Sequence, residues 1–131
     1  MPKKGFTLIE LMLVVIIIGA LSAMVIPRLA GRSEQARVAA AKADVNANIA
    51  TAIKLYELDN GNYPRSLDDL LKQPASAVNW NGPYLERDPV DPWGRLYRIK
   101  CPGTHRPQSY DLYSVGKDGQ AGTDDDVKNW D

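Results

Sequence analysis

The stretch Phe6–Ile26, FTLIELMLVVIIIGALSAMVI, determines how the rest of this 131-residue chain is organised. It is almost wholly apolar and holds one carboxylate, Glu10. With a rise of about 1.5 Å per residue, a helix of this length crosses a hydrocarbon core about 30 Å thick. A buried core helix is disfavoured, because such helices keep a polar face and Leu11–Ile18 has none. The stretch therefore predicts a membrane-spanning helix.

Two lysines just before this helix predict its orientation. Lys3 and Lys4 follow the positive-inside rule, so we expect the N-terminus in the cytoplasm and the remainder across the membrane. A cleaved secretory signal is the alternative, since Ala20–Ala23 contains small residues typical of a cleavage site. Such a signal has no reason to carry Glu10, because a carboxylate at the bilayer centre costs up to about 3 kcal/mol and needs a partner.

Length and composition leave room for one small domain beyond the anchor, of about one hundred residues. The formal net charge is zero, which gives no electrostatic case for nucleic acid as a partner. The single cysteine, Cys101, cannot form an intrachain disulfide and is predicted to be buried or inert. The single histidine, His105, has no carboxylate or nucleophile patterned around it and is predicted to be a solvated loop residue. No set of nucleophile, base and orienting group emerges, so we expect a protein that is not an enzyme.

Residues 28–60 predict an amphipathic continuation of the first helix, ended by Asn60–Gly61. Its apolar stripe recurs at spacings of three and four residues: Val38, Ala41, Val45, Ile49, Ala52, Ile53 and Tyr56. Pro27 stands at the junction of the two halves and should kink or locally open the helix, because it removes a backbone hydrogen bond. The prediction is one long N-terminal helix, half anchor and half amphipathic.

The region after this helix predicts a small antiparallel sheet, hence an α+β fold. Residues 66–71 predict a short helix capped by Ser66, with Asp69 three residues later. Residues 95–100 and 110–115 predict two strands, which we expect to pack on the long helix. The turn Asp91–Gly94 presents an aromatic residue.

An acidic tail is the second chemically informative stretch. Asp118, Asp124, Asp125 and Asp126 fall within a few residues of one another among glycines, and their charges would repel in a folded loop without a counter-ion. Calcium accepts six to eight oxygen ligands and tolerates irregular loops, although the spacing here does not match an EF-hand. The alternative is a frayed acidic C-terminus. Composition alone favours neither interpretation.

At the N-terminus, the segment Lys4–Glu10, KGFTLIE, resembles the class III signal of type IV pilins and pseudopilins. The resemblance implies that a prepilin peptidase cuts between Gly5 and Phe6 and N-methylates Phe6. Residues 1–5 would then be a leader, residues 6–30 a transmembrane and filament-core helix, and residues 31–131 a periplasmic globular domain.

The same resemblance gives roles in assembly to three residues of the anchor. Glu10 would neutralise the terminal amine of a neighbouring subunit in a filament, since two opposite charges tolerate burial only together. The helix between Gly19 and Pro27 would lose order on assembly. For Pro27, a simple membrane-interface position is the alternative.

Three further motifs narrow the resemblance and extend it over essentially the whole chain. They are the run from Tyr56 through Asp59–Pro64, the segment Asp88–Gly94 (DPVDPWG), and the acidic tail with Trp130. Together they resemble the major pseudopilin family of the type II secretion system (general secretion pathway protein G). The resemblance implies a type IV pilin-like α+β fold with a calcium-ordered C-terminal loop.

This resemblance also implies one structural Ca²⁺ in the tail. Asp118, Asp125 and Asp126 match carboxylate ligands of the family, and Val115 and Thr123 match positions that contribute oxygens. Asp124 is a substitute ligand or a carboxylate just outside the set. We expect weak affinity, with a Kd of about 10⁻⁴–10⁻³ M at its weakest, as in extracellular modules.

The function implied is that of a major structural subunit, anchored by one span in the inner membrane. Copies would polymerise into a helical pseudopilus in the periplasm, together with minor pseudopilins and an inner-membrane assembly platform driven by a cytoplasmic ATPase. The fibre would help push folded proteins through the outer-membrane secretin. One alternative is a type IV pilin for adhesion, motility or DNA uptake, although the single cysteine argues against the disulfide-closed form. A more distant alternative is a membrane-anchored metal-dependent hydrolase that uses the aspartates of the tail.

Overall fold

The computed structural model describes residues 1–131, except for the side chains of residues 26–30. Its helical elements are α1 (Leu8–Ala43), the π segment η1 (Asp44–Asn48), α2 (Ile49–Asn60) and the 3₁₀ segment η2 (Leu67–Leu70). Its strands are β1 (Arg98–Lys100), β2 (Asp111–Ser114) and β3 (Val127–Lys128). The predicted effect of Pro27 on the helix lies outside the described residues.

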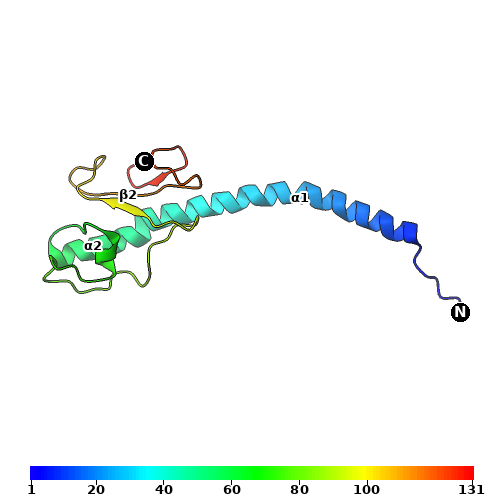
Figure 1. The fold of residues 1–131 in the computed structure, drawn as a ribbon, viewed down its shortest axis with the longest axis horizontal. Helices are drawn as coiled ribbons and strands as arrows, with labels where there is room; N and C mark the ends of the chain where they lie inside the picture. The colour runs from blue at the N-terminus through cyan, green and yellow to red at the C-terminus, as the bar shows by residue number, and fades with distance from the viewer. The chain divides into compact units, whose positions relative to one another are not determined.

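The chain divides into two compact units, which we call the N-terminal unit (Met1–Ala36) and the C-terminal unit (Arg37–Asp131). In the N-terminal unit, α1 carries the segment Leu8–Val25, whose mean hydropathy is 2.7 and none of which is buried. This part of α1 is blue to light blue in Figure 1. Length and composition make it a candidate membrane span.

In the C-terminal unit, the predicted apolar stripe forms the core side of the spine made by the end of α1, η1 and α2. The stripe from Ala41 to Tyr56 is buried as predicted, and Val38 packs partly buried against it. The prediction of an uninterrupted α-helix is wrong at η1, where π-type hydrogen bonds replace the α-helical pattern. The spine keeps its buried face through η1, since Val45 and Ile49 are both buried.

The ends of the helical segments follow the local sequence signals. Gly61 has a φ of 77°, and its N–H donates to the Glu57 carbonyl at 2.7 Å, which ends α2. The short helix predicted at residues 66–71 is the 3₁₀ turn η2. Its capping box is complete. The Ser66 side chain accepts a backbone N–H from the turn, and the Asp69 side chain accepts the backbone N–H of Ser66.

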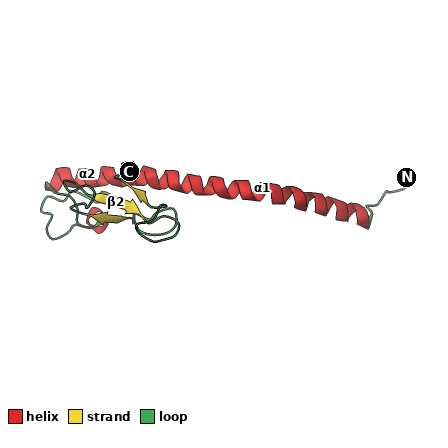
Figure 2. Ribbon diagram, turned by 90° about the horizontal axis from the view of Figure 1, so that it is seen from above, coloured by secondary structure: helices red, strands yellow, loops and turns green.

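The sheet has three antiparallel strands in the order β1-β2-β3, so β2 is central (Figure 1). Ile99 pairs with Leu112, and Ser114 pairs with Val127. Figure 2 shows these strands on one side of α2, and β2 contacts η1. This confirms the predicted α+β arrangement of the C-terminal unit.

The strands differ from the prediction in length and number. Residues 95–97 precede β1 and contribute only an isolated bridge between Val90 and Leu96. The strand β3 was not predicted, because two residues at the end of an acidic tail carry no alternating pattern. Leu112 in β2 is fully buried and belongs to the same core as the spine.

Candidate functional site

The tail loop, residues 115–126, joins β2 to β3 and contains every predicted metal ligand. Its direction changes at Gly116, Gly119 and Gly122, whose φ values are 65°, 74° and 87°. Glycine adopts this left-handed region without steric penalty, so these positions suit a tightly turning loop.

Asp125 is the centre of the loop's hydrogen bonding. Its Oδ2 accepts the Asp118 N–H at 2.9 Å, and its Oδ1 accepts the Thr123 hydroxyl at 2.5 Å. The hydrogen bond from Thr123, together with that from Asp118, holds the pKa of Asp125 below its usual range. A Cβ on Gly116 would collide with the Asp125 carbonyl oxygen and come within 2.6 Å of Asp125 Oδ2. The carboxylate therefore lies directly against the first turn of the loop.

Three acceptor oxygens lie near the Thr123 hydroxyl, which has a single proton to donate. Its Oγ1 is 3.1 Å from the Gln120 carbonyl oxygen, 2.5 Å from Asp125 Oδ1 and 3.3 Å from Asp126 Oδ1. A threonine hydroxyl has one hydrogen to donate. Oxygens of two neighbouring carboxylates thus approach one hydroxyl, an arrangement that a bound cation would relieve.

The remaining predicted ligands have other surroundings. Asp126 Oδ2 accepts the Gly122 N–H at 2.7 Å, and Asp118 Oδ1 accepts the Gln120 N–H at 2.8 Å. Val115 is buried and could offer only its backbone carbonyl, and Asp124 is exposed. The loop thus brings together Thr123, Asp125 and Asp126. Across residues 1–25 and 31–131, no three His, Cys, Asp or Glu side chains are close enough to hold a metal ion.

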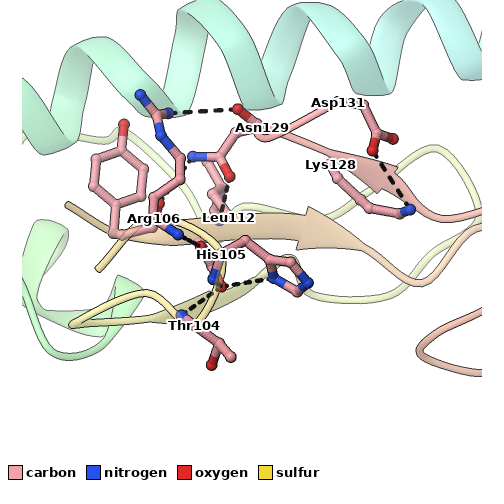
Figure 3. A network of polar contacts seen from close by, with 9 residues as sticks. Thr104, His105, Arg106, Leu112, Lys128, Asn129 and Asp131 are labelled. Carbon is pink, nitrogen blue, oxygen red and sulfur yellow. Dashed lines mark hydrogen bonds and ion pairs between the residues drawn. The ribbon is translucent and has the colours of Figure 1, made fainter. Parts of the chain in front are cut away.

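A second polar cluster joins the loop after β1 to β2. Asp111 is 2% exposed, and its carboxylate accepts the backbone N–H groups of Thr104, His105 and Arg106 at 2.8 to 3.0 Å. His105 Nδ1 lies 3.1 Å from Asp111 Oδ2 (Figure 3). Burial raises the pKa of Asp111, but the hydrogen bonds from His105, Thr104 and Arg106 outweigh it and leave the pKa below its ordinary value.

The prediction that His105 is a solvated loop residue is confirmed, but the expectation that no carboxylate lies around it is wrong. Its side chain is 53% exposed, yet it contacts Asp111 and stacks on the Trp130 ring with centroids 4.2 Å apart. Sequence reasoning missed this pair because the partner lies six residues away, across a loop. Cys101 is partly buried and burial raises the pKa of its thiol, consistent with an inert role.

The end of the tail is fastened to the sheet beside this cluster. The Asn129 N–H donates to the Leu112 carbonyl, and the Asn129 side chain both accepts from Leu112 N–H and donates to the Tyr110 carbonyl. Lys128 and Asp131 form an ion pair at 3.6 Å (Figure 3). Trp130, in addition to His105, meets Tyr113 edge-on. The tail is therefore not a frayed end.

In the N-terminal unit, Glu10 caps its own helix. Its carboxylate accepts the Thr7 N–H at 3.3 Å, and the Thr7 hydroxyl accepts the Glu10 N–H at 3.2 Å. This capping box was readable in the sequence as T-x-x-E, and the prediction overlooked it. Gly5 and Phe6 are exposed ahead of the helix, and a Cβ on Gly19 would meet nothing within 4 Å.

Two family models match adjoining segments of the chain. A family model described as type II secretion system (T2SS), protein G, matches residues 28–130. A second, described as prokaryotic N-terminal methylation motif, matches residues 1–26.

Individual relatives agree with these models. The type II secretion system core protein G of Pseudomonas aeruginosa is 47% identical, and the match covers 98% of this chain and 96% of the relative. Its counterpart in Escherichia coli (strain K12) is 42% identical, with 98% and 91% covered. The crystal structure of the major pseudopilin from the type 2 secretion system of enterohaemorrhagic Escherichia coli matches with a TM-score of 0.68. That match has 31% identity and covers 76% of this chain and 87% of that one.

Proposed function

Because the chain belongs to the type II secretion system protein G family, we propose that it is the major structural subunit of a pseudopilus and not an enzyme. Its copies polymerise into a helical fibre that helps push folded proteins through the outer-membrane secretin. The observation that carries this proposal is the family match over residues 28–130, which follows the methylation motif matched at residues 1–26. The type IV pilin alternative has no comparable support.

The protein is membrane-anchored through its apolar N-terminal helix, consistent with the methylation motif. We assign it a single pass through the inner membrane, with the C-terminal unit in the periplasm. The prepilin peptidase would remove residues 1–5 by cutting between Gly5 and Phe6, and would then methylate Phe6. Residues 6–30 would remain as anchor and filament core, and residues 31–131 as the periplasmic domain. The exposed cleavage position and Lys3 and Lys4 support this assignment.

In the assembled fibre, the carboxylate of Glu10 gains a partner for its charge within the hydrocarbon. Within one chain, its carboxylate has only Thr7 to interact with among the contacts described. The amine of a neighbouring processed subunit would neutralise it, since an unpaired charge is costly in lipid. Gly19 and Pro27 would act in the same step by allowing the helix to loosen. The family implies other secretion components as partners, and we assign minor pseudopilins and the inner-membrane assembly platform to that role.

Replacing Glu10 tests the assembly proposal. In cells that lack their own major pseudopilin, Glu10→Ala should abolish the fibre and secretion of the exported proteins, because it removes the charge that pairs subunits. The melting temperature of the C-terminal unit should not change, since Glu10 makes its contacts within the N-terminal unit. Glu86→Ala, an exposed carboxylate, is the matched control. Fibres and secretion from the Glu10→Ala protein at the control level would refute the proposal.

We assign one structural Ca²⁺ to the tail loop. The donors gathered there are oxygens only, which is the set calcium prefers. Asp125 and Asp126 would supply carboxylates, Thr123 and Val115 further oxygens, and Asp118 a third carboxylate after its side chain leaves the Gln120 N–H. Asp124 remains a substitute ligand. When bound, the ion would balance the negative charge that collects around Thr123.

Thermal unfolding of the full chain in detergent tests the calcium assignment. A site occupied at one hundred times its Kd adds about 2.7 kcal/mol to the free energy of unfolding. That should raise the melting temperature of a domain this size by about 10 °C or more. The shift should be absent with magnesium and lost in Asp118→Ala and Asp125→Ala, whereas the exposed control Asp88→Ala should keep it. Equal melting temperatures in chelator and in calcium at one hundred times the weakest expected Kd would rule the site out.

A further inference from the structure

The turn formed by residues 91–95 is held together by a buried carboxylate. Asp91 is 4% exposed, and its Oδ1 accepts the N–H groups of Trp93 at 3.1 Å and Arg95 at 2.9 Å. Its Oδ2 accepts the hydroxyl of the fully buried Ser114 at 2.6 Å. Ser114 ends β2, directly before the tail loop. The turn is therefore joined to the start of a loop more than twenty residues away in sequence.

Both backbone groups of Gly116 are hydrogen-bonded, the N–H to Ser114 and the carbonyl to Arg95 of the turn. The Gly116 N–H donates to Ser114 Oγ at 3.1 Å, the same oxygen that donates to Asp91. The Gly116 carbonyl accepts from Arg95 Nη1 at 2.9 Å. A residue whose N–H and C=O are both fixed has little freedom to rotate. The conformation of the loop's first turn is thus set from outside the loop.

The Arg95 guanidinium also covers the next turn of the loop. A Cβ placed on Gly119 would come within 2.7 Å of Arg95 Cζ and Nη2. On its other side, Gly116 lies against Asp125, as described above. Within the segment from Val115 to Gly119, Arg95 therefore contacts the backbone at Gly116 and lies against Gly119, and Asp125 lies against Gly116. This segment carries two of the positions assigned to calcium, Val115 and Asp118.

We propose that Arg95, oriented by Asp91 and Ser114, is a positioning residue for calcium binding. The inference rests on the calcium site proposed above. Arg95 does not itself contact the ion. Its planar fork fixes Gly116 and covers Gly119, so that the oxygens of Val115 and Asp118 are presented before the ion arrives. Preorganised ligands bind more tightly because less ordering remains to be done on binding.

If Arg95 acted on the ion through its charge instead, its replacement would change the calcium affinity in the opposite direction. A guanidinium close to a cation site would by charge alone repel Ca²⁺ and weaken binding. If repulsion dominates, Arg95→Gln should bind calcium more tightly than wild type. If positioning dominates, it should bind more weakly. Arg95→Lys separates charge from shape further, because lysine keeps the charge but lacks the planar fork.

The test is calcium titration by calorimetry of the full chain in detergent, with melting temperatures measured in excess chelator. We expect about tenfold weaker affinity or more in both Arg95→Gln and Arg95→Lys, the scale of one hydrogen bond from a charged donor. Ser114→Ala should shift affinity in the same direction. Arg98→Gln removes the same charge from an exposed position in β1 and should bind as wild type does. Melting temperatures of the Arg95 variants should fall more in calcium than in excess chelator, because the loss of calcium affinity adds to the loss of the hydrogen bond to Gly116.

Three results would overturn the inference. Unchanged or tighter binding by Arg95→Gln would show that positioning does not set affinity. Unchanged affinity with melting temperatures lowered equally in calcium and in chelator would make Arg95 a stabilising residue only. A wild-type chain that binds no calcium would overturn the calcium site itself, and is distinguished from the first two results because it appears before any substitution.

Discussion

The two units of the chain use the same apolar residue types in opposite ways. In the N-terminal unit, Leu8–Val25 is entirely unburied. In the C-terminal unit, Ile53, Leu70 and Leu112 are buried completely. Burying one such side chain contributes about 1.5–3 kcal/mol. The C-terminal unit gains this within a single chain, whereas none of Leu8–Val25 is buried within the chain, which leaves these side chains available to lipid or to other copies. Stability and assembly therefore reside in different parts of the molecule.

Truncating one leucine in each unit is the strongest test of this division. Leu112→Ala should lower the free energy of unfolding by about 2–5 kcal/mol, because it leaves a cavity in the core. Leu13→Ala should leave it unchanged in detergent, since Leu13 is 53% exposed. Urea unfolding of the full chain, followed by tryptophan fluorescence, measures both. All three tryptophans, Trp80, Trp93 and Trp130, lie in the C-terminal unit.

The same pair should behave differently in the fibre. There Leu13→Ala should weaken assembly if neighbouring anchors cover this side chain. The division would fail if Leu13→Ala destabilised the detergent-solubilised chain as much as Leu112→Ala does.

A smaller effect is expected from Asp111, which ties a loop to the sheet by charge and not by apolar burial. Asp111→Asn should lower the free energy of unfolding at pH 7 by about 1.5–3 kcal/mol, the range for hydrogen bonds to a charged group. The folded pKa of Asp111 lies below its ordinary value of 3.8, so its contribution is complete above that value. It is lost as the pH falls through the lowered folded pKa. The gap between variant and wild type should therefore narrow below about pH 4.

Urea unfolding at pH 7 and pH 3, in chelator to remove any effect of calcium, measures this gap. Asp88→Asn, at an exposed position, should unfold as wild type does at both values. A gap for Asp111→Asn that stayed constant from pH 7 to pH 3 would show that its carboxylate charge is not what stabilises the loop.

Much of the fold could be predicted because its signals are local. The spine helix follows from apolar residues at spacings of three and four, its end from Gly61, and the short turn η2 from Ser66 and Asp69. The apolar run after Phe6 indicates the anchor by length alone. The central strand β2 lies within residues 110–115, which predict a strand without its partners because aromatic and apolar residues alternate there with polar ones.

The sequence pattern missed features that depend on contacts between distant segments. The two residues of β3 become a strand only because β2 lies beside them. His105 gains a carboxylate partner through a loop that brings Asp111 back to it, and Arg95 reaches Gly116 across 21 positions. At the predicted calcium site, the pattern indicated that the predicted ligands share one loop. It could not show that Asp118 turns to Gln120 while Asp125 and Asp126 share Thr123.

The position of β3 also affects the order in which the molecule can be completed. β3 is the last of the three strands to leave the ribosome, yet it pairs with β2, the middle strand of the sheet. The spine and the β1–β2 pair can form as the chain emerges, but until Val127 and Lys128 follow, one edge of β2 stays open. An unpaired strand edge invites pairing with other chains. Pairing of β3 with β2 therefore closes the edge through which incompletely folded copies would aggregate.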